Sequence, residues 1–134
     1  MIKIQEQDFN LDDELTFIKS KHNHIGAVST FIGYVRDINN NKKVTSIDLE
    51  VYQEMAEKSL GIICNQAKKK WKLVDTLVIH RFGILNINEK IVLVATFSIN
   101  RQDSIAACNY IMDYLKKDAP FWKKEFYEKN CRWL

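Results

Sequence analysis

Apolar residues recur along this chain with two different periods, and the change of period predicts where helices and strands lie. Three stripes have helical spacing, and Asn10 and Asn100 stand before the first and the last as candidate N-caps. The stripes are Leu11, Leu15 and Ile18; Ala56, Leu60, Ile63, Ala67 and Trp71; and Ile105, Cys108, Met112 and Leu115. They predict three main helices, each with one face packed inward.

Segments rich in β-branched and aromatic residues, some with alternating polarity, predict the strands between these helices. These segments are residues 1–5, 25–35, 47–52, 74–82 and 90–99. The centre of 90–99 is almost unbrokenly apolar, which predicts burial on both faces. The polar run 37–43 is expected to be an exposed, mobile loop, and 83–89 a turn or a short bent strand.

The end of the chain leaves two alternatives open. Pro120 must end or break the third helix, because proline lacks the N–H that a helix interior needs. Residues 121–134 are then expected to form a helical turn that leads into either an exposed tail or an edge strand. With either ending, the predicted fold class is α+β.

Length and composition are those of one globular domain spanning 1–134. The chain has 134 residues, of which 46% are hydrophobic and 28% charged, enough for a core without disulfides or metal. Its first residues lack the basic start and apolar stretch of a signal peptide, and no apolar run is long enough to cross a bilayer. We therefore expect a cytoplasmic protein without a membrane partner.

Cysteine and histidine do not indicate a metal site or a nucleophile. Cys64, Cys108 and Cys131 are far apart and form no CxxC pair; the first two suit core packing, and the third is undecided. His22 and His24 lie at a polar helix-to-strand junction and are expected to be solvated. His80, in the middle of a strand, is interpreted as structural. No metal and no cofactor are expected.

Cations at the ends of predicted elements are the candidate chemistry. Arg36 follows a strand, Arg101 opens a helix, and Lys116 and Lys123 flank the Pro120 bend. Arginine offers a fork of donors to phosphate, and a helix N-terminus such as that at Arg101 attracts anions. Taken alone, lysines near a helix end, such as Lys117 and Lys124, commonly stabilise the helix dipole and nothing else.

A second basic run supports a different class of function. Lys68, Lys69, Lys70 and Lys72 surround Trp71, a pattern compatible with a non-catalytic module that binds polyanions or nucleic acid. A solvated helix face explains these lysines equally well, so we do not expect a nucleic-acid partner.

The segment 113–125, DYLKKDAPFWKKE, resembles the large, catalytic subunit of molybdopterin synthase, the MoaE family. In that family an apolar helix end, Lys, Ala-Pro-Phe-Trp and Lys follow in the same order. Further similarity runs through 26–36 with its Gly-Tyr-Val-Arg end, through Glu57-Lys58, through 78–83 and through 111–113, so nearly the whole chain is covered.

The resemblance implies an α/β-hammerhead-like fold with a mixed, mainly antiparallel sheet, and a sulfurtransferase activity. The enzyme would insert two sulfurs into cyclic pyranopterin monophosphate to form molybdopterin, in molybdenum cofactor biosynthesis. The sulfur donor would be a small ubiquitin-like sulfur-carrier subunit with a C-terminal Gly-Gly thiocarboxylate. The resemblance also implies a homodimer within a heterotetramer. Because the sulfur would arrive already activated, this chain would need no cysteine nucleophile. An inactive scaffold that keeps the subunit interface is the remaining alternative.

The same resemblance assigns roles to residues of this chain. Lys116 and Lys123 would be the catalytic pair and would also contact substrate. Arg36 and Arg101 would hold the pterin phosphate and nearby oxygens, with Arg101 acting in the partner protomer's site. The remaining residues of the implied substrate pocket are Val35, through its backbone, Lys124 and Glu125.

Two departures from the family pattern affect the phosphate site. Asn100 stands where the family commonly has a histidine, so hydrogen bonding is kept but titration is lost. The chain also stops at Arg132-Trp133-Leu134, where relatives usually continue and supply a further arginine, a role that Arg132 could take.

Overall fold

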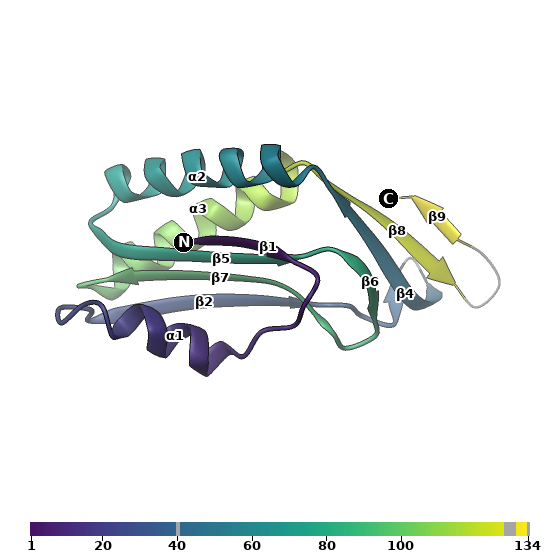
Figure 1. Ribbon diagram of the computed structural model, residues 1–134, viewed down its shortest axis with the longest axis horizontal. Helices are drawn as coiled ribbons and strands as arrows, with labels where there is room; N and C mark the ends of the chain where they lie inside the picture. The colour runs from purple at the N-terminus through teal and green to yellow at the C-terminus, as the bar shows by residue number, and fades with distance from the viewer. Residues whose placement is uncertain (40, 128–130, 134) are drawn as a thin grey trace.

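The computed structural model describes residues 1–39, 41–127 and 131–133 and has an α+β architecture (Figure 1). The helices are α1 (Leu11–Lys19), α2 (Gln53–Lys70) and α3 (Arg101–Lys117). The strands are β1 (Ile2–Gln5), β2 (Ala27–Tyr34), β3 (Ile38–Asn39), β4 (Lys42–Val51), β5 (Leu73–Arg81), β6 (Gly83–Asn86), β7 (Lys90–Ser98), β8 (Phe121–Tyr127) and β9 (Cys131–Trp133). The predicted α+β class and its mainly antiparallel sheets are confirmed.

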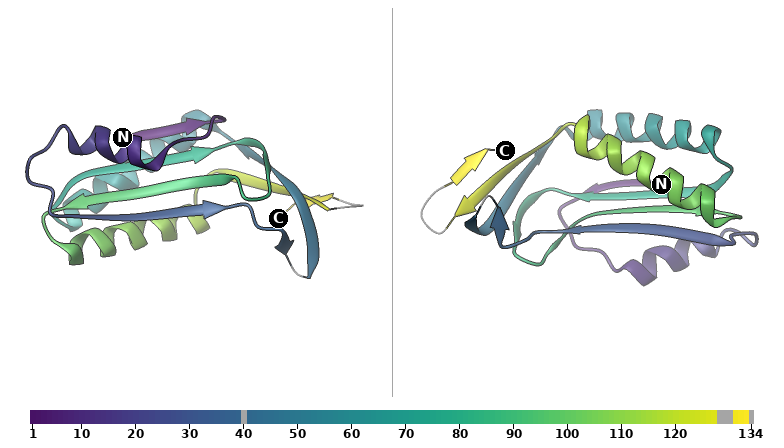
Figure 2. Two further views of the ribbon diagram at one scale, coloured as in Figure 1. Left: turned by 90° about the horizontal axis from the view of Figure 1, so that it is seen from below. Right: turned by 180° about the vertical axis from the view of Figure 1, so that it is seen from behind.

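The first sheet has the order β1-β5-β7-β2, with β1 parallel to β5 and the other pairs antiparallel. Helices α2 and α3 cover one face, and α1 covers the other (Figures 1 and 2). Because successive strand residues point to opposite faces, Val78 packs under α2 and α3 while its neighbours Leu77 and Ile79 pack against α1. The burial of β7 on both faces is confirmed, with Leu93 through Ser98 all buried.

The second sheet projects beyond the end of the first and is built around β4 (Figure 2). It has the order β3-β4-β8-β9, and β6 also pairs with β4. A separate apolar cluster of Val35, Val44, Ile47, Leu49 and Leu85 fills its inner side. The predicted helical turn after Pro120 is wrong, since Phe121–Tyr127 forms β8, an inner strand between β4 and β9. The edge-strand alternative for the end of the chain is the one adopted, by β9.

Both predicted N-caps are confirmed. Asn10 Oδ1 accepts the Asp13 N–H at 3.0 Å, and Asn100 Oδ1 accepts the Asp103 N–H at 2.8 Å. Each bond satisfies a backbone donor that the first turn of a helix leaves without a partner. Asn100, the residue that departs from the family pattern, thus fixes where α3 begins.

Two further expectations about local structure are wrong in part. The run 37–43 is largely exposed at its described positions, as predicted, but it forms a strand pair instead of a loop, because Ile38 pairs with Lys43 and Asn39 with Lys42, while Asn41 takes a φ of 64°. Asn40, inside the same run, lies outside the described residues. On α3, Ile105 is 53% exposed and does not belong to the inner face as predicted. Cys108, Met112 and Leu115 do pack against the core, together with the buried Ser104, Ala107 and Ile111.

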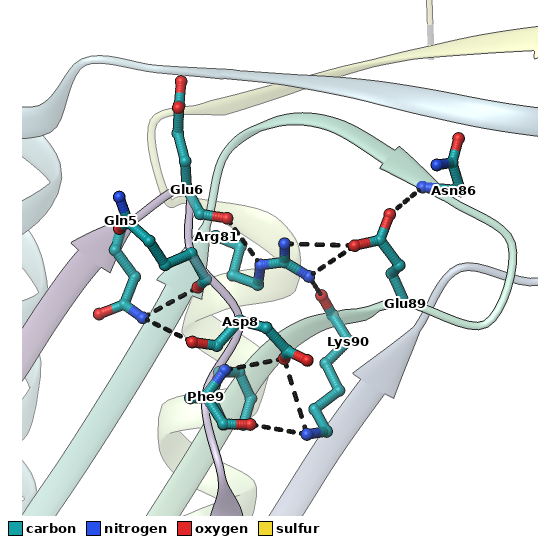
Figure 3. A network of polar contacts seen from close by, with 9 residues as sticks. Gln5, Glu6, Asp8, Phe9, Arg81, Asn86, Glu89 and Lys90 are labelled. Atoms are coloured by element: carbon teal, nitrogen blue, oxygen red, sulfur yellow. Dashed lines mark hydrogen bonds and ion pairs between the residues drawn. The ribbon is translucent and has the colours of Figure 1, made fainter.

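A buried arginine network joins the two sheets on the side of the N-terminal segment (Figure 3). Arg81 is 6% exposed; its guanidinium donates to the carbonyl oxygens of Glu6 and Lys90, each at 2.9 Å, and reaches Glu89 Oε1 at 3.3 Å. The other oxygen of Glu89 accepts the Asn86 N–H at 2.6 Å. These partners compensate the buried charge of Arg81. The network therefore holds the connection between β5 and β6 in one conformation.

His22 and two lysines of the basic run 68–72 make contacts with other residues of the chain. His22 was expected to be solvated, but its Nε2 lies 3.0 Å from Asp75 Oδ2; His24 is exposed as expected. Lys68 also lies near Asp75, and Lys70 lies over the rings of Trp71 and Tyr110. Lys68 and Lys70 of the basic run therefore have partners inside this chain. In the part of the chain that the structure describes, no helix is long and apolar enough to cross a membrane.

Candidate functional site

The candidate site residues at the end of β2 are positioned by a tight backbone arrangement. Val35 is 3% exposed; its N–H donates to Glu89 O at 2.9 Å, and its carbonyl accepts the Asn88 N–H at 2.8 Å. These two hydrogen bonds fix the backbone of Val35. The next residue, Arg36, points away from the core, and its side chain is exposed. Arg36 Nη2 lies 3.5 Å from Asn39 Oδ1.

Asn39 connects this segment to β8 through a buried carboxylate. Its Nδ2 donates to both oxygens of Glu125, at 2.8 and 3.0 Å, and Tyr127 donates its hydroxyl to Glu125 Oε1 at 2.6 Å. Glu125 is 4% exposed, so these donors offset the loss of water around its charge. Sequence reasoning did not single out Asn39, whose partner is 86 residues away and leaves no local signal.

The register of β8 separates the two lysines that follow Trp122. Lys123 lies opposite Leu49 and Lys124 opposite Asp48. Because residues directly opposite share a face, Lys123 lies on the side of the buried Leu49, and Lys124 lies on the other side. The ammonium of Lys124 is 5.5 Å from the centre of the Phe126 ring.

Lys116 stands in the last turn of α3, just before the bend that starts β8. The bend is closed by the Phe121 N–H, which donates to Ala119 O at 2.8 Å. The Phe121 ring then packs against the core under α2 and α3 and stacks on His80. The fold thus carries Lys116 and Lys123 on adjacent ends of α3 and β8, one on each side of a fixed turn.

Arg101 lies at the opposite end of the same helix. Fifteen residues separate it from Lys116, which at 1.5 Å per residue is roughly 22 Å along the axis. Both side chains are exposed, and at 100° per residue they fall within about 60° of each other around the helix. One copy of the chain therefore does not bring Arg101 to Lys116.

A hollow of about 530 Å³ lies between α3 and β2, on the helix face that carries Arg101 and Lys116. Its apolar lining includes Phe31, 39% exposed, Ile105, 53% exposed, and Met112. The Phe31 ring folds back over Gly33, where an added Cβ would lie 3.4 Å from it. Strand β2 ends the sheet order on this side, so an exposed apolar strip runs along a sheet edge.

A second hollow, with a volume of about 1030 Å³, is acidic. Asp48, Glu50 and Glu54 line it together with one lysine, Lys58. Its lining includes none of the candidate site residues. An anionic ligand would be repelled by these carboxylates, so this hollow does not suit a phosphate.

Neither of the two cysteines whose side chains the structure describes is activated as a nucleophile. Burial raises the pKa of Cys108 to about 11, and burial also raises that of Cys64, so both thiols stay protonated at neutral pH. Both cysteines are buried, as predicted; the side chain of Cys131 lies outside the described residues. A protonated, buried thiol is a poor nucleophile.

Comparison with known proteins gives one consistent family. The family described as MoaE protein matches residues 4–118. A protein of Ralstonia nicotianae, named molybdopterin synthase catalytic subunit, is 48% identical over 99% of this chain and 76% of its own length. A Pseudomonas aeruginosa protein of the same name is 43% identical over 99% of this chain and 89% of its own.

Solved structures with the same fold carry corresponding names. The molybdopterin biosynthesis MoaE protein from Burkholderia ambifaria has a TM-score of 0.87 and 40% identity, covering all of this chain and 88% of its own. Molybdopterin synthase from Staphylococcus aureus has a TM-score of 0.91 and 32% identity, over 98% of this chain and 95% of its own. The 4–118 match ends before Pro120, but these full-length similarities extend across β8.

Proposed function

Since the chain belongs to the MoaE family and is a catalytic subunit of molybdopterin synthase in molybdenum cofactor biosynthesis, we propose that it catalyses sulfur insertion into cyclic pyranopterin monophosphate. The sulfur donor is a small ubiquitin-like subunit whose Gly-Gly tail ends in a thiocarboxylate. The observation that carries the proposal is the pair Lys116 and Lys123, held on adjacent ends of α3 and β8 by the 118–120 bend.

The chemistry exchanges one carbon–oxygen bond for one carbon–sulfur bond, twice per product. The thiocarboxylate sulfur attacks a carbon of the substrate, and the departing oxygen takes up a proton and leaves as water. Water then hydrolyses the resulting thioester, which returns a carboxylate on the small subunit and leaves a thiol on the pterin. No oxidant or reductant is needed, and no cysteine of this chain takes part.

Lys116 and Lys123 are the proposed catalytic residues. Lysine cations beside the reacting atoms stabilise the thiocarboxylate and the oxyanion formed as sulfur transfers, and one of them supplies the proton to the leaving oxygen. The bend between them is held by a backbone hydrogen bond and by packing of Phe121, so the backbone positions of the two lysines are fixed before substrate binds.

The phosphate of the substrate is proposed to lie between Arg36 of one copy and Arg101 of another. Arg101 lies about 22 Å from Lys116 on the same side of α3, so a two-fold pairing of this helix face runs the helices in opposite directions and brings Arg101 toward the partner's Lys116. The exposed side chains of Phe31 and Ile105, with the partly buried Met112 between them and the core, supply an apolar surface for that pairing. The assembly is then a homodimer within a heterotetramer.

Three further residues complete the proposed substrate site. Val35 contributes its carbonyl, which has a second lone pair beyond the bond to Asn88. Lys124 lies on the opposite face of β8 from Lys123 and contributes positive charge at longer range. Glu125 is buried under Asn39 and Tyr127, which suits a supporting role more than direct contact.

Reconstitution tests the proposal directly. The purified chain is mixed with a thiocarboxylated small subunit and cyclic pyranopterin monophosphate, and molybdopterin is assayed together with complex formation. Product formation supports the proposed function. A correctly assembled complex that makes no product identifies an inactive scaffold and contradicts it.

A further inference from the structure

We propose that Asn39 is a positioning residue, which holds the guanidinium of Arg36 in its substrate-binding orientation by coupling it to the buried carboxylate of Glu125. The inference rests on the proposed function, because it takes Arg36 as a phosphate ligand. It adds a residue that the sequence did not indicate, and it gives Glu125 an indirect role in substrate binding.

The geometry is a three-residue chain that begins in the interior and ends at the surface. The two carboxylate oxygens of Glu125, which is 4% exposed, accept from the Asn39 amide nitrogen at 2.8 and 3.0 Å. The amide oxygen of Asn39 in turn lies 3.5 Å from Arg36 Nη2. A buried anion, a neutral amide and an exposed cation thus lie in series.

The order of charges leaves the Asn39 amide only one stable orientation. Turned by 180°, it would direct its oxygen at the Glu125 carboxylate and its NH₂ at the Arg36 cation, and both contacts would be repulsive. Tyr127 fixes the carboxylate from a second direction by donating at 2.6 Å. The amide oxygen is therefore held facing the guanidinium.

The contact with Arg36 is suited to a site that must still accept a ligand. At 3.5 Å it is longer than an ordinary hydrogen bond, and it uses one of five guanidinium donors. It restricts the direction of the side chain while the other donors remain able to bind phosphate. Because Arg36 is already ordered before the substrate binds, less side-chain conformational entropy is lost on binding.

The backbone around Asn39 supports the same conclusion. Asn39 pairs with Lys42 in the β3–β4 hairpin, and Val44 donates its N–H to Asp37 O at 2.7 Å. These contacts fix the backbone at position 39, three residues after Arg36. A loop of free conformation would not keep an amide between the two charges.

The test measures sulfur insertion by the reconstituted complex at varied cyclic pyranopterin monophosphate. Asn39→Ala should raise KM by about tenfold and change kcat by less than about threefold, because the substrate phosphate and not the reacting atoms is affected. The matched control is Asn41→Gly in the same hairpin, at a position with φ of 64° that glycine accepts readily. It should leave KM unchanged.

A double-variant cycle separates positioning of Arg36 from general support of the hairpin. If Asn39 acts through Arg36, adding Asn39→Ala to Arg36→Ala should cause no further rise in KM. Independent, additive effects of the two substitutions would overturn the proposal. Thermal melts of each variant show whether the chain remains folded.

Glu125→Gln provides a second test if Asn39→Ala does not fold. The glutamine keeps an oxygen for the Asn39 and Tyr127 donors but removes the charge that orients the amide. KM should rise by about threefold in the wild-type background and not at all with Arg36→Ala. An unchanged KM in an otherwise normal Glu125→Gln complex would overturn the proposal. Wild-type turnover with a normal KM for Arg36→Ala would instead overturn the phosphate role of Arg36 and this proposal with it, while leaving sulfur transfer itself intact.

Discussion

The imidazole of His80 lies stacked on the ring of Phe121, with ring centroids 3.7 Å apart and planes 19° from parallel. His80 belongs to β5 of the first sheet, whereas Phe121 begins β8 of the second. Phe121 and Lys123 share a face of β8, because they are two residues apart. The stack therefore joins the two sheets next to the strand that carries a proposed catalytic lysine.

The buried position of His80 predicts a stability loss in mild acid. Burial lowers its pKa from 6.5 to about 4, while an acceptor in the Arg81 carbonyl opposes this shift. The unfolded chain takes up a proton as pH falls below about 6.5, and the folded chain only near 4, so unfolding becomes easier across that window. The shift corresponds to about 3 kcal/mol of unfolding free energy at pH 4 relative to pH 7.

Denaturant melts of the wild type and of His80→Phe between pH 7 and pH 4 check this prediction. Phenylalanine keeps a ring against Phe121 but cannot titrate, so the variant should lose less stability on acidification. His24→Ala, at an exposed histidine, is the control and should follow the wild type. Parallel pH profiles for His80→Phe and the wild type would rule out His80 as the source.

Removing either proposed catalytic amine should reduce turnover sharply. Lys116→Ala and Lys123→Ala should each lower kcat by on the order of 100-fold or more, because a cation beside the developing charge is lost. Small-subunit binding should stay close to normal. Lys117→Ala, next to Lys116 and also exposed, is the matched control. Near-normal turnover in Lys116→Ala or Lys123→Ala would remove that lysine from the mechanism.

The apolar strip on α3 and β2 should control dimer formation. Ile105→Asp places a charge on the proposed contact and should shift the chain toward monomer in sedimentation experiments, with loss of activity. Ile62→Asp is the control, because Ile62 is 51% exposed, close to the 53% of Ile105, but lies on α2. Dimers that persist in Ile105→Asp, or monomers in both variants, would exclude this face as the specific contact.

Mixing Arg101→Ala and Lys116→Ala chains should restore activity at substrate concentrations well below the KM of Arg101→Ala, if each site uses residues of two copies. In a hybrid of Arg101→Ala and Lys116→Ala chains, one site contains both substitutions and the other contains neither. Random pairing makes half of the dimers hybrid, so about a quarter of wild-type turnover should return. No recovery after subunit exchange has been verified would place Arg101 outside the partner's site.

The N-cap of α3 should contribute to stability measurably. Asn100→Ala removes the acceptor for the Asp103 N–H and should cost about 1 kcal/mol, or roughly 3 to 5 °C in Tm. Asn100→Asp, which keeps an acceptor and adds a favourable charge at the helix N-terminus, should retain most of that stability. Calorimetry of the three proteins checks the order; equal Tm values would mean that the cap is not limiting.

Much of the fold was predictable because its signals are local. Apolar spacing identified α1 and α2, the caps at Asn10 and Asn100 followed from residue type, and unbroken apolarity identified β7 as buried on both faces. On α3 only Ile105 was misplaced, since it has the hydrophobicity of a core residue but lies exposed beside a sheet edge, whereas Cys108, Met112 and Leu115 pack inward as predicted. Which apolar residues a helix buries depends on what packs against it.

The α+β class, the two capped helix starts, the buried cysteines and, through the Ala-Pro-Phe-Trp segment with its flanking lysines, the family can all be inferred from the residues alone. The contact of Asn39 with Glu125 and the stacking of His80 on Phe121 became known only from the folded chain. Helix periods and caps arise among residues a few positions apart. Contacts between residues 40 to 90 positions apart depend instead on sheet order and register, which no short segment encodes.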